Sequence, residues 1–427
     1  MNVLLVGGRG RKRWRAGVLG LMAVAGVGSA LAHPTLSQEV SYPVVLGFER
    51  FYAAGDPEAY LAEGGKLLLN ELNCVACHQV PSEWSSWFPG RAGPSLEGVA
   101  SRVRSSFVLQ LQVRNPRFLK RGTTMPSLFS AGDRDPQELD ALFHYLASKR
   151  LSEGEPMLLG EVEAGKELYH EVGCVACHAP DLEYFPARWP PDQGWDFPGM
   201  NSIPLRWAGV WEAPFLTRYL LEPERFHPAE RMPGASFTEM EAAHVAAYLQ
   251  DGMALPERDM GEVVIDESLR RRGEDLFVTK GCASCHEGGE EVEPRVWKPL
   301  LALAVEPTGC LAEKPQEGGV PHYFLSDLQR DVLLMALRSL PSWEPDERRL
   351  AEVMRQQMDC YACHTYEGKG GPETSREPYF GALNPRAVDR ERWLPRDLGK
   401  NDNTWVSETW ARKSGMCEKR ARERRDQ

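Results

Sequence analysis

Cys74-Val75-Ala76-Cys77-His78 decides how this 427-residue chain is interpreted, because the same Cys-x-x-Cys-His pattern occurs four times. The other copies are Cys174-Val175-Ala176-Cys177-His178, Cys282-Ala283-Ser284-Cys285-His286 and Cys360-Tyr361-Ala362-Cys363-His364. Two thiols at this spacing add across the two vinyl groups of a haem, and the adjacent imidazole becomes the proximal ligand of the iron. Eight of the ten cysteines lie in these motifs. The pattern therefore predicts four covalently attached haems, each with the motif histidine on its iron.

Zinc binding and disulfide formation are the alternative uses of such cysteines. A structural zinc site needs Cys-x-x-Cys units close enough to complete a tetrahedron. Here the motifs lie roughly 75 to 110 residues apart, and each carries a histidine directly after its second cysteine. This spacing favours separate haem sites. Cys310 and Cys417 lie outside the motifs, and an oxidising compartment would allow them to pair.

The first 32 residues have the three parts of a secretion signal. Five basic side chains lie between Arg9 and Arg15, a short apolar stretch covers residues 16–28, and Ala30-Leu31-Ala32 is a cleavage site of small residues. The apolar stretch is short for a transmembrane helix, so we expect membrane association only through an uncleaved signal. Haem is attached to such motifs outside the bacterial inner membrane. The signal and the motifs therefore predict a periplasmic or otherwise exported protein with a Sec-type signal peptide.

The charge balance excludes some classes of partner. The chain has 50 basic and 61 acidic residues, and the signal contains five basic and no acidic ones, so the mature balance is 45 against 61, or −16. An acidic surface argues against nucleic acid and against a polybasic membrane patch. It suits docking with a basic redox protein. The length predicts about three or four domains.

A repeated helix precedes each motif. A small residue stands nine positions before each first cysteine, in the order Gly65, Gly165, Gly273 and Ala351. It allows close approach of a second helix. An apolar pair follows in the first three repeats, as Leu68-Leu69, Leu168-Tyr169 and Leu276-Phe277. We expect these pairs to face the second helix and the edge of the haem.

The second helix is predicted near the end of each of the first three repeats. It covers residues 136–148, 239–249 and 327–337, and Thr238 and Ser326 are suitable N-cap residues for the last two. A proline-containing loop lies between the motif and this helix. The loops contain Gly93-Pro94, Pro204-Leu205 and Pro299-Leu300.

With these features, residues 55–380 resemble the class I c-type cytochrome domain, repeated four times. The resemblance implies an all-α fold with crossing terminal helices, a proline carbonyl that orients the proximal histidine, and a Met-Pro turn that supplies the sixth iron ligand. The chain is also similar to multihaem cytochromes built from tandem class I modules. The predicted domains are a signal peptide (1–32), cytochrome c domains at 33–153, 154–257 and 258–343, and a partial fourth domain with an irregular basic tail (344–427).

The sixth ligands implied by this resemblance are Met125 in the first repeat and Met232 in the second. Each is followed by proline and precedes the last helix of its repeat. A thioether opposite histidine raises the haem potential and fills the coordination sphere, which favours electron transfer. A methionine that merely packs in the core is the alternative for each.

The third repeat departs from this pattern. Val320 aligns with Met232 without a gap, and valine cannot bind iron. His322 is two residues further on and is a candidate sixth ligand. An open or water-bound iron is the second alternative, and another residue such as Met335 is the third.

The fourth repeat is predicted to be incomplete. Residues 386–427 are rich in arginine, lysine and tryptophan and contain no convincing closing helix. Met416 is the only methionine after the fourth motif and is a poor ligand candidate. We expect a truncation or frameshift near residue 390, and therefore four haems c, or three if this repeat is defective.

These features predict a multihaem electron carrier with no catalytic residues of its own. Its expected partners are redox proteins such as a dehydrogenase or a terminal reductase. Two rival functions use an open third haem: a haem peroxidase-like enzyme, with His322 or the adjacent Glu290 and Glu291 as the distal group, and a gas sensor. There is no nucleotide fingerprint or Ser-His-Asp arrangement in a convincing context.

Overall fold

The computed structural model of the chain describes residues 42–53, 58–120, 122–129, 135–151, 158–181, 202–203, 205–229, 231–251, 263–287, 297–303, 306–314, 320–373, 376 and 379–380. Four features of the sequence lie outside these residues: the predicted signal peptide, Glu290 and Glu291, Pro204, and the tail with Met416 and Cys417. The predictions made for them are not tested by the structure.

The described residues are mainly helical, as predicted. The longer helices are α2 (Glu58–Glu71), α3 (Phe107–Arg114), α5 (Pro136–Ser148), α6 (Val162–Glu171), α7 (Ala213–Leu221), α9 (Glu239–Gln250), α10 (Glu267–Thr279), α11 (Asp327–Ser339) and α12 (Glu347–Gln357). Three short helices are α1 (Leu46–Phe51), α4 (Pro116–Leu119) and α8 (Pro223–Phe226). Two short antiparallel strands, β1 (Thr365–Tyr366) and β2 (Lys369–Gly370), follow the fourth motif. The all-α fold class is therefore confirmed.

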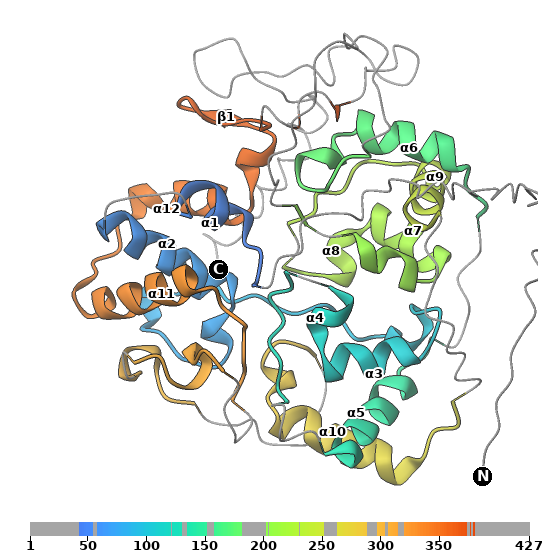
Figure 1. The fold of residues 1–427 in the computed structure, drawn as a ribbon, viewed down its shortest axis with the longest axis horizontal. Helices are drawn as coiled ribbons and strands as arrows, with labels where there is room; N and C mark the ends of the chain where they lie inside the picture. The colour runs from blue at the N-terminus through green and yellow to red at the C-terminus, as the bar shows by residue number, and fades with distance from the viewer. Residues whose placement is uncertain are drawn as a thin grey trace, which may run out of the picture. The chain divides into compact units, whose positions relative to one another are not determined.

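Three helix pairs organise the buried core (Figure 1). In the second repeat α6 packs against α9, as predicted. The other two pairs differ from the prediction: α2 of the first repeat packs against α11 of the third, and α10 of the third packs against α5 of the first. The expectation that each helix pair forms within one repeat is thus wrong for the first and third repeats. These two repeats exchange their second helices. Neither of the predicted domains 33–153 and 258–343 therefore contains both helices of a packed pair.

The predicted small residues lie where the paired helices cross. A Cβ atom added to any of the three glycines would collide with a backbone carbonyl of the partner helix. The colliding pairs are Gly65 with Val332, Gly165 with His244 and Gly273 with Ala141. The glycines permit contact that no larger residue allows. The pattern identified a crossing point correctly but did not identify the partner.

The aromatic residues beside these glycines pack against the partner helix. Tyr169 lies 5.5 Å from Tyr248 between ring centroids, and Phe277 lies 5.3 Å from Tyr145. All four rings are buried. The predicted packing against a second helix is therefore confirmed for the aromatic residue of each pair, although Phe277 meets a helix from another repeat. The predicted contact with the haem edge stays a prediction.

The predicted N-caps of α9 and α11 are confirmed. Thr238 and Glu241 form a capping box, and so do Ser326 and Gln329. In each box the hydroxyl accepts from the N3 amide and the N3 side chain accepts from the N-cap amide. These bonds satisfy helix-start donors that would otherwise lack partners.

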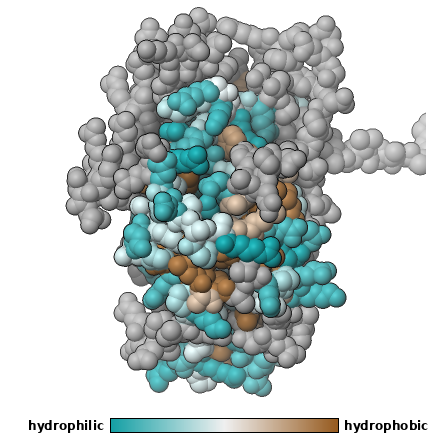
Figure 2. Space-filling model, turned by 90° about the vertical axis from the view of Figure 1, so that its left-hand side faces the viewer, coloured by the Kyte–Doolittle hydropathy of each residue, from teal (hydrophilic) through white to brown (hydrophobic). Residues whose placement is uncertain are grey.

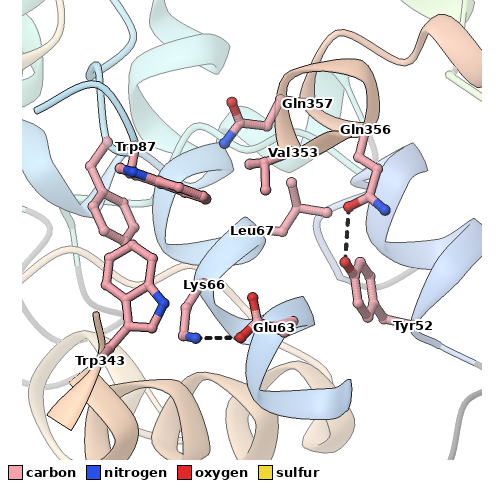
Figure 3. A pocket seen from close by; sticks show the side chains of 10 residues that line it. Tyr52, Glu63, Lys66, Leu67, Trp87, Trp343, Val353, Gln356 and Gln357 are labelled. Atoms are coloured by element: carbon pink, nitrogen blue, oxygen red, sulfur yellow. Dashed lines mark hydrogen bonds and ion pairs between the residues drawn. The ribbon is translucent and has the colours of Figure 1, made fainter. Parts of the chain in front are cut away.

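The helix of the fourth motif, α12, packs against α1 and α2. Figure 3 shows the small pocket left between these elements, where Tyr52 Oη donates to Gln356 Oε1 over 2.8 Å and Lys66 pairs with Glu63. Trp87 and Trp343 close one side, with ring centroids 5.2 Å apart. No residue of the four motifs lines this pocket, so we assign it to the packing between helices.

Glu49 makes the junction between α1 and α11 sensitive to pH. Burial raises the pKa of this carboxyl from 4.5 to about 7, against the opposing effect of a hydrogen bond from Gln329. The folded state therefore binds a proton more tightly than the unfolded state. This contribution to stability is full below pH 4.5 and is lost as the pH rises through about 7.

We therefore expect the free energy of unfolding to fall between pH 4.5 and about 7 more steeply in the native protein than in a Glu49→Gln variant. Denaturant titrations of both proteins across this range measure the difference. Parallel pH profiles would show that Glu49 does not bind the extra proton in the folded state.

Candidate haem sites

All four motifs fold into the same turn directly after a helix. The residue before each first cysteine adopts the left-handed conformation: Asn73 (φ 57°), Gly173 (87°), Gly281 (90°) and Asp359 (53°). A short 3-10 turn follows, in which the backbone N–H of the motif histidine donates to the carbonyl of the first cysteine over 2.8–3.0 Å. Glycine, asparagine and aspartate tolerate this conformation best. The residue at this position is a signal that the sequence analysis overlooked.

The side chains of three motif histidines are anchored by a backbone carbonyl. His78 Nδ1 lies 2.8 Å from the Lys298 carbonyl oxygen, and His286 Nδ1 lies 2.8 Å from that of Pro94. His178 Nδ1 lies 2.9 Å from the Ile203 oxygen. Since a carbonyl only accepts, Nδ1 carries the proton and Nε2 keeps its lone pair for a metal. The expected proline carbonyl is found at Pro94, whereas the other two carbonyls belong to residues that directly precede a proline.

The motif cysteines are half-buried, and six of the eight thiols have a raised pKa that keeps them protonated at neutral pH. Burial raises the pKa of Cys174, Cys282 and Cys363 to about 12, and it also raises the pKa of Cys74, Cys177 and Cys285. None of the described cysteines forms a disulfide, and the described residues contain no cluster of three or more Cys, His, Asp or Glu suited to a metal ion. In this part of the chain the zinc and disulfide alternatives are therefore not supported.

The residues fit a covalently bound haem. Each motif supplies two thiols for the vinyl groups, and at three motifs the hydrogen bond described above leaves Nε2 as the ring nitrogen that can bind iron. When bound, the haem supplies an iron that alternates between Fe(II) and Fe(III) and so takes up and releases one electron. The protein contributes the ligands, the burial and the neighbouring charges that set the potential.

The motifs lie in two neighbouring pairs. Asn73, before the first motif, donates from Nδ2 to Cys285 Sγ of the third motif over 3.3 Å. Asp359, before the fourth motif, accepts from Cys177 Sγ of the second over 3.5 Å. In both pairs the residue in the left-handed conformation reaches the second cysteine of its neighbour. The first motif thus adjoins the third, and the fourth adjoins the second.

A buried ionic cluster connects the two pairs. Glu71, at the end of α2, is 3% exposed and forms ion pairs with Arg91, at 2.6 Å, and with Arg231. Arg91 also donates to the Gln357 carbonyl beside the fourth motif, at 3.4 Å. Burial lowers the pKa of Arg231 to about 10 and raises that of Asp359 to about 6, although each charge stabilises the other.

Arg50 and Arg376 hold the fourth motif and its neighbour in place. Arg50 donates to the carbonyls of Tyr361 and Gly371, each over 2.6 Å. Arg376 is 2% exposed and donates to the carbonyls of Val175 and His178 over 2.9 and 3.1 Å. Neither arginine could be recognised from the sequence, because only the folded chain brings them to these carbonyls.

The two predicted methionine ligands lie in different surroundings. Met232 packs against a buried cluster that contains Val175 of its own repeat, and Cys174 packs against the same cluster. Met125 is half-buried, and its Sδ accepts from Gln112 Nε2 over 3.2 Å. Its neighbours Leu128 and Phe129 belong to the cluster that contains Phe277 and packs against Cys282 of the third repeat. Iron ligation by either methionine stays a prediction.

The ring of His322 is held by groups of its own repeat. It is 4% exposed, its Nε2 lies 3.3 Å from the Glu313 carbonyl oxygen, and it stacks edge-on against Phe324 at 4.3 Å between centroids. Burial lowers its pKa, which favours the neutral ring. The structure thus places His322 in a packed setting, and its role as a sixth ligand stays a prediction.

Comparison with known proteins supports this interpretation for the second repeat. The Cytochrome c family matches residues 162–252, the span that begins with α6 and ends just after α9. No curated protein and no solved structure matches the chain. The match supports an electron-transfer protein with a class I cytochrome c fold and covalently bound haem c. None of the described helices has both the length and the apolar character needed to span a membrane.

Proposed function

We propose that the protein is an exported multihaem c-type cytochrome that transfers electrons between redox partners. The observation that carries this proposal is the common turn of the four motifs, in which two half-buried cysteines and a histidine take the same places each time. Together with the family match at the second repeat, this repetition supports one haem c at each motif. The contacts between neighbouring motifs support short electron-transfer steps within the 1–3 and 2–4 pairs.

The expected partners are redox proteins such as a dehydrogenase or a terminal reductase. Figure 2 shows that hydrophilic residues cover most of the described part of one face, with smaller hydrophobic patches between them. The calculated mature charge of −16 gives the protein a negative electrostatic potential. Such a surface favours fast, salt-sensitive docking with a basic partner. Export through a Sec-type signal belongs to the same proposal.

The number of haems per chain tests the proposal directly. The full-length chain would be produced with the haem-attachment machinery, and its intact mass would be compared with that of four variants, each with both cysteines of one motif changed to serine. Four haems in the native chain and three in every variant are expected. Three haems in the native chain, unchanged by the Cys360→Ser/Cys363→Ser variant, would identify the fourth motif as inactive. A native chain without haem would overturn the proposal.

The peroxidase-like and gas-sensing alternatives require an iron with an open distal side. Val320, which replaces methionine in the Met-Pro pattern, is the observation that keeps them in consideration. A ferric spectrum unchanged by peroxide and a ferrous spectrum unchanged by carbon monoxide would reject both alternatives. Peroxide turnover with a reduced donor would instead establish the enzyme, and binding of carbon monoxide to one haem without turnover would favour the sensor.

A further inference from the structure

We propose that the first and third haems exchange distal sides: Met125 of the first repeat ligates the haem held by His286, and the haem held by His78 faces the Val320 segment of the third repeat. The inference rests on the proposed multihaem function. The exchange also changes which iron is expected to lack a methionine ligand. Val320 replaces methionine in the third repeat, but its segment would then face the haem of the first motif.

The second repeat shows what surrounds one motif when all parts come from one repeat. Its helix α6 packs on α9, the His178 ring bonds to the Ile203 carbonyl, and Met232 packs on the cluster beside Cys174. A motif helix, a loop carbonyl, a methionine segment and a closing helix therefore form one unit. The same four parts can be located around the first and third motifs.

The parts around the third motif come from the first repeat. Helix α10 packs on α5, where Tyr145 contacts Phe277 as Tyr248 contacts Tyr169 in the second repeat. The His286 ring bonds to the Pro94 carbonyl, and Gly93 N donates to the Cys285 carbonyl over 2.6 Å.

The methionine segment next to the third motif also comes from the first repeat. Lys280, the C-cap residue of α10, lies over the ring of Phe129, at 5.2 Å from its centroid. Phe129 is four residues after Met125. Leu128 packs on the cluster that also borders Cys282. The segment that contains Met125 thus belongs to the unit of the third motif.

The parts around the first motif come from the third repeat. Helix α2 packs on α11, the His78 ring bonds to the Lys298 carbonyl, and Leu300 N donates to the Gln79 carbonyl over 2.8 Å. Tyr323 packs on the cluster that also borders Cys74. The Val320-Pro321 segment therefore takes the place that Met232-Pro233 takes in the second repeat.

The two exchanged segments also meet each other. Ser127 and His322 form an antiparallel bridge in which each backbone N–H donates to the other carbonyl over 2.9 Å. Ser127 follows Met125-Pro126, and His322 follows Val320-Pro321, so equivalent positions of the two repeats face each other. The bridge therefore joins the two units directly beside the proposed ligand positions.

Met125→His tests whether Met125 ligates the third haem or the first. The substitution is made in two backgrounds, each of which lacks the cysteines that attach one of these haems. The readout is the near-infrared charge-transfer band of methionine-ligated ferric haem, recorded on the purified holoprotein. We expect Met125→His to weaken this band in the Cys74→Ser/Cys77→Ser background, which retains the third haem. In the Cys282→Ser/Cys285→Ser background we expect no effect, because the iron that Met125 serves is already absent. The reverse pattern would overturn the exchange.

A second measurement does not depend on these variants folding. Lys280 at the C-cap of α10 and Glu138 of α5 form an ion pair at 2.6 Å, so a zero-length carbodiimide reagent is expected to join them in the monomeric native holoprotein. Lys166 and Asp181, 3.0 Å apart within the second repeat, are the matched positive control. Formation of the control link without the Lys280–Glu138 link would contradict the exchange. Haem counting by mass remains separate, so failure of the multihaem proposal is distinguishable from failure of this one.

Discussion

Met232→His is expected to lower the reduction potential of one haem while the haem content stays the same. A thioether is a soft ligand that stabilises Fe(II), whereas an imidazole favours Fe(III). Axial ligands set haem potentials over a span of about 0.8 V, and exchanging methionine for histidine is expected to move one haem by a sizeable fraction of it. Because Met232 and Cys174 pack against the same buried cluster, the affected haem is expected to be the one held by the second motif.

Potentiometric titration followed by absorbance measures this change. The expected result is the disappearance of one high-potential step and the appearance of one low-potential step, with weakening of the methionine charge-transfer band. Met240→His is the matched control, since Met240 lies in the same repeat on α9 and is 46% exposed. A Met232→His titration that overlays the native curve would show that Met232 only packs in the core.

Much of the local structure could be predicted from the sequence. The motif turns, the N-caps of α9 and α11 and the glycines at the helix crossings all depend on residues close together in the chain. The second repeat was predicted with its correct helix pair for the same reason. There the two helices follow each other along the chain, and the family match covers both of them.

The exchange of helices could not be predicted in this way. Gly65, Gly165 and Gly273 identify a face that a second helix can approach, but all three motif helices carry the same signal. The partner helices α5, α9 and α11 are also alike, since each presents a buried apolar face. Proximity in the chain favoured pairing within a repeat. The structure instead pairs Gly273 with Ala141 and Gly65 with Val332, and only the assembled contacts select these partners.

The arginines around the motifs were missed for a related reason. Arg50, Arg91 and Arg376 carry no recognisable pattern, and each meets carbonyls far away in the chain. Burial of an arginine is rare unless its donors are satisfied. A buried arginine therefore identifies a connection between motifs only after the fold has placed its acceptors.

Of the substitutions proposed for this protein, Glu71→Gln is expected to lower the free energy of unfolding most, by about 3–5 kcal/mol. The substitution keeps the side-chain volume and removes the charge that Arg91 and Arg231 share, at a side chain that is 1% exposed. The two guanidinium groups would then lose the carboxylate that they share in a partly buried site, and this loss of compensation for their desolvation is the physical cause of the effect.

The matched control for this prediction is Glu222→Gln. Glu222 pairs with Arg225 at 3.3 Å, but its carboxylate is 49% exposed, so the change should stay below about 1 kcal/mol. Guanidinium chloride titrations of the holoproteins measure both effects. Equal midpoints for the two variants would mean that water or another group compensates the arginines. A large loss confined to Glu71→Gln would instead identify Glu71 as the counter-charge between the two motif pairs, because Arg91 reaches the fourth motif and Arg231 directly precedes Met232.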